Sequence, residues 1–313
     1  MRLIFLGSPA FAVYPLEALV AAGHTIAAVI TQPDRPAGRE RRLTPPPVKV
    51  AAERLGLPVL QPATLRDSNV VAQLTELRPE AGIVAAYGEI LRRNVLAIPP
   101  LGYLNVHPSL LPRHRGPTPV AGAILAGDAE TGVSIMLLDQ GMDSGPILAQ
   151  ITVPLPPDAR TGPLTEELFR LGARLLVEAL ESYAAGALTP QPQDHARATI
   201  TRLLKKEDGQ IDWSLPAAHI ERMTRAYDPW PGAYSHWRGQ PLRILSAAVR
   251  PDPPGAPSAP GTLLGRGPAG GPLVATGQGA LELLEVQPAG KRAMPGADWF
   301  NGLRDPTGRL GDA

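Results

Sequence analysis

Apolar residues in the first half of the chain occur in short runs that alternate with segments of helical periodicity. The runs RLIFLG, TIAAVIT, PVLQP, AGIVAAYG and GYLNVH have the length and composition of β-strands. Helices are predicted around residues 10–22, 48–55, 67–77 and 89–97, where Gly23 and Gly56 stand at positions typical of helix C-termini. Strands that alternate with helices predict a parallel sheet with helices on both faces.

The pattern changes in the second half of the chain. Residues 131–151 predict two strands joined by a glycine-containing turn, and a long helix follows from Leu164 to Ala185. After a polar, proline-punctuated stretch, one short helix near residues 217–227 precedes strand-like runs that Gly and Pro turns separate. We therefore predict a Rossmann-like α/β domain with a mostly parallel sheet at 1–189, a linker at 190–206 and a small OB-like β-barrel at 207–313.

Composition narrows the possible functions. The 313 residues carry a formal net charge of +1 and a pI of about 8.1, so no global field indicates a nucleic-acid or membrane partner. The absence of cysteine excludes disulfides, thiolate catalysis and Cys-ligated metals. We find neither a signal-peptide layout nor an apolar run of roughly 18 residues, and expect a cytoplasmic protein that does not enter a membrane. Neither the dinucleotide fingerprint nor a P-loop is present.

The stretch NVHPSLLP, at residues 105–112, places polar side chains at the end of a predicted strand. Asn105 and His107 are two residues apart, so on a strand they project to the same face. Pro108 should end the strand, because it lacks an amide donor and restricts the residue before it. Ligands of open α/β sheets bind beyond the carboxyl ends of the strands. The alternative is a turn with satisfied polar groups.

An Asn/His pair gains a catalytic meaning if a carboxylate can orient the imidazole or take its proton. The segment LLDQGMDSGPIL offers Asp139 and Asp143 in a glycine-rich turn between two apolar runs. Glycine permits close approach of the backbone to a ligand. From spacing alone, both aspartates could equally make Asx-turns.

Taken together, NVHPSLLP and GMDSGPIL resemble the shared signature of the folate-dependent formyltransferases. That resemblance implies catalytic roles for Asn105, His107 and Asp143, and it favours Asp143 over Asp139 because Asp143 precedes the Ser-Gly pair. Segments in both halves of the chain are similar to the methionyl-tRNA formyltransferase family: TQPDRPAGRERRLTPPPVK, RGPTP, AGDAETGVSIM, IDWS, RAYDPWPGAY and VQPAGKRAMPG. Glycinamide ribonucleotide formyltransferases share the first motif but lack the long loop and the second domain.

The family implies transfer of a formyl group from 10-formyltetrahydrofolate to the α-amino group of methionyl initiator tRNA, by a monomer and without a metal. Asn105 would donate a hydrogen bond to the oxygen of the tetrahedral intermediate, and protonated His107 would add a charged donor. Asp143 would take the proton that leaves the amine, directly or through a water molecule.

The folate is expected beside the ends of two strands and the 139–143 turn. The residues predicted to form its site are Tyr87, Gly88, Ile90, Leu91, Ser109, Leu110, Leu111, Pro112 and Asp139.

Two groups of basic residues are predicted to contact tRNA. The loop at 32–44 carries Arg35, Arg39, Arg41 and Arg42, and the resemblance singles out Arg39, which follows Pro-Ala-Gly, for the acceptor stem. The alternative for this loop is a solvated charged segment. Phosphate contacts are expected from Lys205, Lys206, Arg243, Lys291 and Arg292.

Three departures from the family pattern concern the tRNA side of the site. His114 stands where tryptophan is common, Pro117-Thr118 replaces Ala-Ala, and Glu40-Arg41-Arg42 replaces Gly-Lys-Lys. Two other functions stay open: hydrolysis of 10-formyltetrahydrofolate, and RNA binding by an inactive scaffold. The long loop and the second domain speak against the first, and the complete Asn/His/Asp set speaks against the second.

Overall fold

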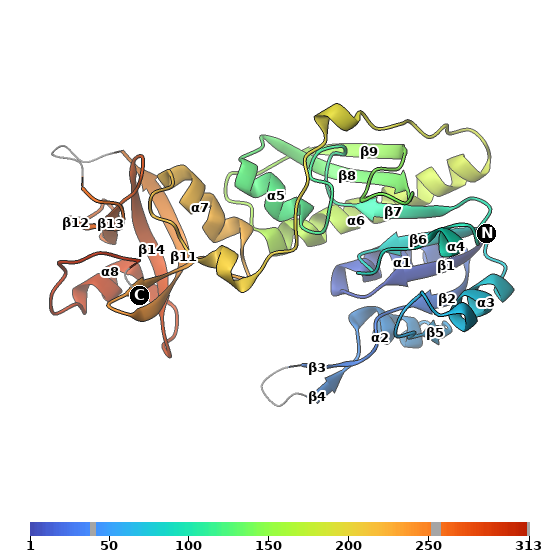
Figure 1. Ribbon diagram of the computed structural model, residues 1–313, viewed down its shortest axis with the longest axis horizontal. Coiled ribbons are helices and arrows are strands. Elements are labelled where there is room, and N and C mark those ends of the chain that lie inside the picture. The colour runs from blue at the N-terminus through green and yellow to red at the C-terminus, as the bar shows by residue number, and fades with distance from the viewer. Residues whose placement is uncertain (38–41, 252–257, 312–313) are drawn as a thin grey trace. The chain divides into compact units, whose positions relative to one another are not determined.

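The computed structural model describes residues 1–37, 42–251 and 258–311 (Figure 1). The chain divides into two compact units. The first comprises residues 1–119, 130–154 and 165–201, and the second comprises 120–129, 155–164 and 202–313. The domain boundaries at 189 and 206 stay predictions, while residues 190–201 belong to the first unit in the structure.

Within its described residues, the first unit contains a seven-stranded sheet with the order β5-β2-β1-β6-β7-β8-β9. Neighbouring strands from β5 to β7 pair in parallel, and β8 and β9 are antiparallel. The prediction of a mostly parallel α/β sheet is confirmed. The strands are β1 Arg2–Gly7, β2 Thr25–Ile30, β5 Val59–Leu60, β6 Ala81–Ala85, β7 Tyr103–His107, β8 Glu130–Leu137 and β9 Ile147–Pro154.

Helices connect these strands, and apolar strand residues such as Ile4, Leu6 and Ile30 form a core with no exposed surface. Gly23 and Gly56 have positive φ angles of 79° and 68°, so both act as predicted at helix C-termini. The helices are α1 Val13–Ala21, after a 3-10 turn at Ala10–Ala12, then α2 Pro47–Arg54, α3 Ser68–Glu76, α4 Arg93–Leu96, α5 Pro119–Ala126 and α6 Thr161–Ala184. Residues 120–126 of α5 belong to the second unit. Helix α4 is shorter than the periodicity at 89–97 indicates, and α5 was not predicted.

A hairpin projects from the first unit near α2 (Figure 1). Strands β3 Arg35–Ala37 and β4 Arg42–Thr44 pair antiparallel within the segment that the sequence predicted only as a shaped loop. Pro36 is compatible with this short strand because the hairpin forms a separate two-stranded sheet, where a missing ladder donor is tolerated. Arg39 and Arg41 lie outside the described residues.

The second unit contains an antiparallel sheet with the order β10-β11-β14-β13-β12, and β15 pairs with β14. Residues near the C-terminus form β-bridges at both edges of this sheet. Leu310 pairs with Trp237 of β10, and Arg309 pairs with Thr262, just before β12. Its elements are a 3-10 turn Lys206–Gly209, α7 Ala217–Ala226, β10 Tyr234–Trp237, β11 Gln240–Arg250, β12 Leu263–Arg266, β13 Pro272–Ala275, β14 Ala280–Pro288, β15 Met294–Pro295 and α8 Gly296–Asn301. Sequence reasoning missed β10, β15 and α8.

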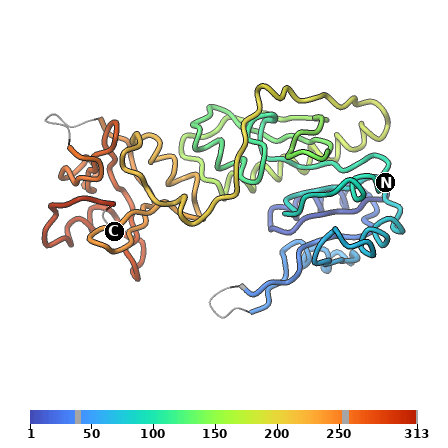
Figure 2. The backbone as a smooth tube through the Cα atoms, in the orientation of Figure 1, coloured from blue at the N-terminus to red at the C-terminus, as the bar shows by residue number. Residues whose placement is uncertain are grey.

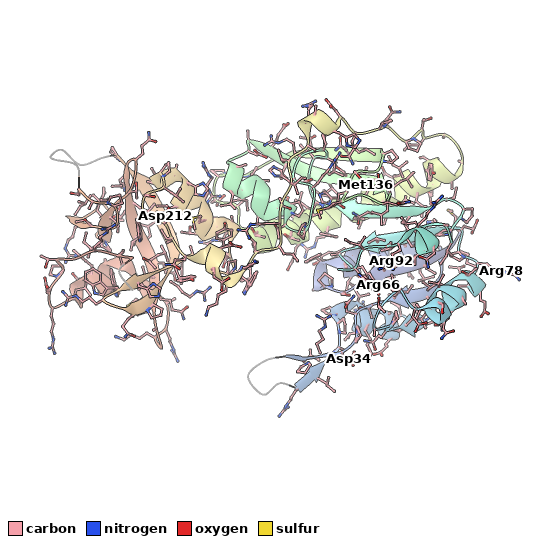
Figure 3. The ribbon with its side chains drawn as sticks, in the orientation of Figure 1. Asp34, Arg66, Arg78, Arg92, Met136 and Asp212 are labelled. Carbon is pink, nitrogen blue, oxygen red and sulfur yellow. The ribbon has the colours of Figure 1, made fainter. Side chains whose placement is uncertain are left out.

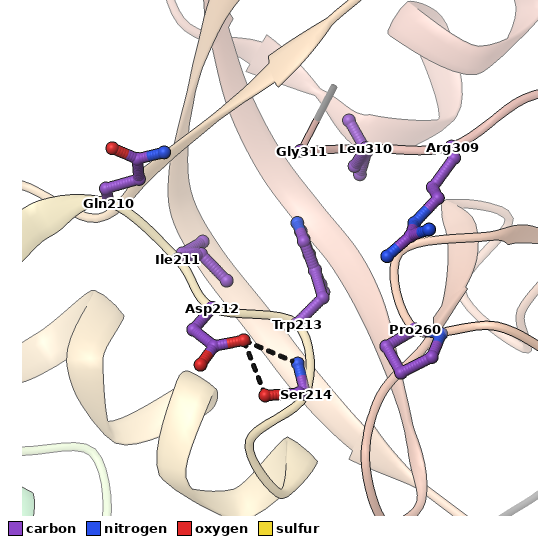
Figure 4. A pocket seen from close by; sticks show the side chains of 9 residues that line it. All are labelled: Gln210, Ile211, Asp212, Trp213, Ser214, Pro260, Arg309, Leu310 and Gly311. Carbon is purple, nitrogen blue, oxygen red and sulfur yellow. Dashed lines mark hydrogen bonds between the residues drawn. The ribbon is translucent and has the colours of Figure 1, made fainter. Parts of the chain in front are cut away.

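The IDWS motif has a structural explanation within this unit (Figure 4). Trp213 is buried, and its indole Nε1 donates a hydrogen bond to the Ser235 hydroxyl at 2.9 Å. Asp212 Oδ1 accepts from the Ser214 hydroxyl at 2.6 Å and from its backbone N–H at 2.9 Å, which lowers the pKa of Asp212. The four residues of the motif line an open cavity of about 450 Å³. The motif therefore stabilises the turn that leads into α7.

Candidate active site

Strand β7 and the loop between β8 and β9 supply the polar groups of the candidate site. Val84 of β6 pairs with Asn105 of β7, so these neighbouring strands end at nearly the same level. Strand β8 continues the sheet, where Met136, labelled in Figure 3, lies opposite Asn105, and Ser134 lies opposite His107. The loop that holds Asp143 connects β8 to β9, so it starts from the strand beside β7.

The three residues predicted to be catalytic lie together. Asn105 Nδ2 is 3.4 Å from Asp143 Oδ1, and His107 Nδ1 is 3.7 Å from Asp143 Oδ2. Asn105 and His107 are only 8% and 4% exposed. The imidazole and the carboxylate form an ion pair when the ring is protonated, and water screens such a pair little in this environment.

Asp143 is held from the other side by a glycine that sequence reasoning did not select. The backbone N–H of Gly116 donates to Asp143 Oδ2 at 2.8 Å. Gly116 has a φ of 101°, and a Cβ atom added there would lie 2.5 Å from the Thr201 carbonyl oxygen. Only glycine fits this position without strain. The RGPTP motif was noted in the sequence, but periodicity could not reveal this contact.

The orientation of the His107 ring is fixed by a backbone carbonyl. His107 Nε2 is 3.0 Å from the carbonyl oxygen of His114, which can only accept, so Nε2 carries a proton and Nδ1 faces Asp143. His114 has a φ of 56°, and its N–H donates to Thr199 Oγ1 at 2.8 Å. This residue, which departs from the family pattern, therefore contributes its backbone to the site.

Ser134 organises the SLLP loop that follows β7. Its hydroxyl donates to the Ser109 carbonyl at 2.6 Å and accepts from the Leu111 N–H at 3.1 Å. Gln150 donates to the Leu111 carbonyl at 2.9 Å and to the Ser134 hydroxyl at 2.8 Å. Ser109 itself donates to the Arg113 carbonyl at 2.7 Å. The loop is thus rigidly shaped, and Ser134 and Gln150 were missed because they lie far away in the sequence.

The residues predicted for folate binding differ in exposure. Gly88 is exposed, with open space where a Cβ would be, and Ile90 is 74% exposed. Leu110 and Pro112 are half-buried, whereas Ser109 and Leu111 are buried.

Two of the predicted folate residues, Tyr87 and Leu91, place their side chains in the hydrophobic core. Burial, with a smaller effect of Glu89, raises the pKa of Tyr87 to about 12. The side chain of Tyr87 therefore remains neutral at physiological pH.

Asp139 has a local role that differs from that of Asp143. Asp139 Oδ1 accepts hydrogen bonds from the Gly141 N–H at 2.9 Å and from the Ser144 hydroxyl at 2.8 Å. This is the Asx-type turn that the sequence left open for both aspartates. The aspartate that contacts Asn105 and His107 is Asp143.

The hairpin β3–β4 is fixed at its base by Asp34 (Figure 3). Lys49 Nζ lies 3.0 and 2.9 Å from the two Asp34 carboxylate oxygens, and Gln61 Nε2 lies 2.7 Å from Oδ1. The Gln61 and Lys49 hydrogen bonds lower the pKa of Asp34. Beyond this anchor, Arg35 and Arg42 are exposed on the two paired strands.

The other basic residues predicted to contact tRNA lie in the second unit. Lys205 and Lys206 begin the 3-10 turn before α7, and Lys291 and Arg292 follow β14. All four are exposed, while Arg243 is half-buried and packs its guanidinium against Gly232. Their contact with tRNA stays a prediction.

Within the described ranges, no group of three or more His, Asp or Glu side chains is arranged to hold a metal ion. Among the helices described, none has the length and apolarity needed to span a membrane.

Comparisons with known proteins show the family of the chain. Residues 1–180 match the family model described as formyl transferase, and residues 203–304 match the model of the formyl transferase C-terminal domain. The methionyl-tRNA formyltransferase of Chloroflexus aurantiacus is 68% identical over 312 residues and covers 100% of both chains.

Two solved structures share the fold. HypX from Aquifex aeolicus, solved in complex with tetrahydrofolic acid, has a TM-score of 0.60 at 19% identity, over 96% of this chain and 47% of that one. The N-formyltransferase from Helicobacter canadensis, solved with folinic acid and dTDP-3-aminofucose, has a TM-score of 0.66 at 15% identity, over 90% of this chain and 99% of that one. The chain belongs to the formyl transferase family and, by its full-length identity, to the methionyl-tRNA formyltransferases within it.

Proposed function

We propose that this protein transfers the formyl group of 10-formyltetrahydrofolate to the α-amino group of methionyl initiator tRNA, for translation initiation. The observation that carries the proposal is the contact of Asp143 with both Asn105 and His107, in a chain of this family. The reaction needs an unprotonated amine, a donor to the developing oxyanion and an acceptor for one proton. These three side chains can meet those needs.

Asn105 and His107 are proposed to stabilise the tetrahedral intermediate. The 3.7 Å between His107 Nδ1 and Asp143 Oδ2 is too long for a direct hydrogen bond. A proton on Nδ1 is therefore available to the formyl oxygen, while the carboxylate still stabilises the positive charge of the ring. The Asn105 amide, 3.4 Å from Asp143, is the second donor.

Asp143 is proposed to accept the proton of the attacking amine. The amine nitrogen bonds to the formyl carbon, the bond from that carbon to N10 of the folate breaks, and N10 takes up a proton as it leaves. The Gly116 N–H, 2.8 Å from Oδ2, would hold the carboxylate in place during this step. A fixed acceptor needs no reorganisation when charge moves, and this lowers the barrier.

The proposed donor site uses the exposed and half-buried members of the predicted set. Gly88, Ile90, Leu110 and Pro112 would contact the folate, while the buried Tyr87, Leu91, Ser109 and Leu111 would support them. Asp139 would act through the turn that it closes. No metal takes part in the proposed reaction.

The proposed acceptor sites divide between the hairpin and the second unit. Arg35, Arg39, Arg41 and Arg42 would contact the acceptor end of tRNA, and Lys205, Lys206, Arg243, Lys291 and Arg292 would contact phosphates. We also propose that the second sheet is an OB-like barrel, which the bridges from Arg309 and Leu310 to both of its sides support. A cytoplasmic monomer is the proposed state.

A formyl-transfer assay tests the proposal. Purified protein with 10-formyltetrahydrofolate is supplied with methionyl initiator tRNA, methionyl elongator tRNA or no tRNA. Formylmethionyl-tRNA should form fastest with the initiator. Formate release without tRNA would indicate a hydrolase instead, and tRNA binding without either product would indicate an inactive scaffold.

A further inference from the structure

We propose that Gln193 is a positioning residue for Asp143, and that residues 191–201 hold the active-site loop rather than serve only as a linker. This inference rests on the proposed function. The sequence places the segment in a polar, proline-punctuated stretch, where flexible linkers are common. Its contacts within the first unit indicate a different role.

The segment is bound to the first unit at both of its ends. Gln191 and Ile147 exchange two backbone hydrogen bonds of 2.8 Å. Further along, the Arg115 N–H donates to the Thr199 carbonyl at 2.9 Å, and the Thr201 N–H donates to the Arg115 carbonyl at 2.7 Å. Figure 2 shows this part of the chain returning across the unit after α6. The segment thus passes over the loops that contain Asp143 and Gly116.

Between these ends, the Gln193 side chain joins both loops. Its Nε2 donates to the carbonyl oxygens of Asp143 at 2.9 Å and Gly145 at 2.7 Å. Its Oε1 accepts from Arg115 Nε at 3.0 Å and from Nη2 at 2.7 Å. Gln193 is 6% exposed, and these four contacts use both N–H groups and both lone pairs of the amide. No other natural side chain of this length offers two donors and an acceptor in this arrangement.

The Asp143 loop needs such support. Asp143 has a φ of 48°, a left-handed conformation that aspartate adopts less readily than glycine does. Gly141 and Met142 are exposed, so the tip of the loop has little packing of its own. Fixing the carbonyls of Asp143 and Gly145 selects the backbone conformation in which the carboxylate points to Asn105 and Gly116.

Gln193 also fixes a buried cation. Arg115 is 7% exposed, and the side-chain partners recorded for its guanidinium are Gln193 Oε1 and, at 3.1 Å, His195 Nδ1. Both partners come from the same segment. Because Arg115 directly precedes Gly116, whose N–H binds Asp143, its position is transmitted along one peptide to the carboxylate.

The test replaces Gln193 by Glu, which keeps the acceptors for Arg115 but removes the two donors, and by Met, which removes all four contacts. The matched control is Gln191→Glu, because the exposed Gln191 side chain donates only to the Thr189 carbonyl. We expect kcat for formyl transfer to fall by about ten- to hundredfold in both Gln193 variants, since small displacements of a reacting group have effects of this size. KM for tRNA and folate should change by less than about twofold.

A double-mutant cycle with Asp143→Asn identifies the path of the effect. If Gln193 acts through Asp143, Gln193→Glu should lower kcat by less than about twofold further in the Asp143→Asn background. Full additivity, or a wild-type kcat in both Gln193 variants, would overturn the inference. So would a lowered thermal midpoint with unchanged kcat per folded molecule, or failure of both variants to fold, since each indicates a purely structural role. Absence of formyl transfer in the wild type would instead refute the proposed function.

Discussion

The site formed by Asn105, His107 and Asp143, which we call the Asn–His–Asp site, and the β3–β4 hairpin of the same unit are built in contrasting ways. In the Asn–His–Asp site, Asn105 and His107 are nearly completely buried. The backbone N–H of Gly116 fixes Asp143, and the backbone carbonyl of His114 fixes the imidazole. The hairpin exposes Arg35 and Arg42, and Asp34 at its base contacts Lys49 and Gln61.

This difference corresponds to two kinds of task. Formyl transfer requires donors and acceptors to be held to within a fraction of an ångström, which burial and backbone hydrogen bonds provide. Contact with a large polyanion relies on exposed positive charge, which long side chains can supply from a simple support. Substitutions in the Asn–His–Asp site should therefore affect kcat, and substitutions in the hairpin should affect recognition of tRNA.

The largest effect is expected from Asp143→Asn. The amide cannot take a proton from the amine, and it removes the negative charge beside His107. Formyl transfer should fall by about two to four orders of magnitude, as is typical when an acid–base group is lost. Steady-state kinetics with both substrates saturating, together with circular dichroism to verify folding, provide the measurement. An Asp143→Asn enzyme with near-normal kcat would show that the proton leaves by another route.

Gly116→Ala compared with Gly88→Ala separates crowding from backbone strain. Both glycines have positive φ, but a Cβ at Gly116 collides with the Thr201 carbonyl, whereas no heavy atom lies within 4 Å of a Cβ at Gly88. We expect Gly88→Ala to cost about 1 kcal/mol of stability from strain alone, and Gly116→Ala to cost more and to reduce kcat. Denaturant unfolding and kcat are measured for both. Equal stability and kcat in the two variants would contradict the role of Gly116.

Arg39→Ala should affect recognition. We expect a higher apparent KM for tRNA, nearly unchanged folate affinity and an altered ratio of kcat/KM for initiator and elongator methionyl-tRNA. Neutralising Lys205 and Lys206 should weaken both tRNAs equally and reduce the salt dependence, as expected for phosphate contacts. The two tRNAs are compared at two salt concentrations. A constant ratio in Arg39→Ala would reduce the hairpin to a general phosphate clamp.

Asp34→Asn should have the smallest effect, because the Asp34 contact is partly exposed to solvent. The apparent KM for tRNA should rise by about two- to fivefold with kcat unchanged, since exposed ion pairs contribute little. Because hydrogen bonds from Gln61 and Lys49 lower the pKa of Asp34 below 3.8, the carboxylate stays ionised at neutral pH. Its stabilising effect should be constant above that value and disappear as the pH falls below it. Unfolding of wild type and Asp34→Asn is compared between pH 2 and 7. A difference that changes near pH 7 would exclude Asp34 as its source.

Much of the first unit could be predicted because its signals are local. Alternating apolar runs and helical periods determine the order of strands and helices, and the spacing of Asn105 and His107 determines their common face. Helix α5 was missed because it is short and contains Gly122, a poor helix former. The β3–β4 hairpin was missed because prolines and charges conceal any alternation.

The supporting contacts of the site could not be predicted from local patterns. Gln193 lies about 50 residues after Asp143 in the sequence, and the approach of Gly116 to Thr201 joins segments that are also far apart in the sequence. Tyr87, which we expect at the folate site, follows strand β6 and places its side chain in the core. Such contacts depend on how distant segments pack, which the periodicity of each segment does not encode.

The most direct test of the chemistry proposed for the Asn–His–Asp site is a single-turnover measurement with His107→Ala. Enzyme in excess over methionyl initiator tRNA, at saturating 10-formyltetrahydrofolate, reports the chemical step without product release. The rate should fall by about two to four orders of magnitude, while the dissociation constant for tRNA stays within about twofold of the wild-type value. A wild-type single-turnover rate in His107→Ala would contradict the proposed chemistry at this site.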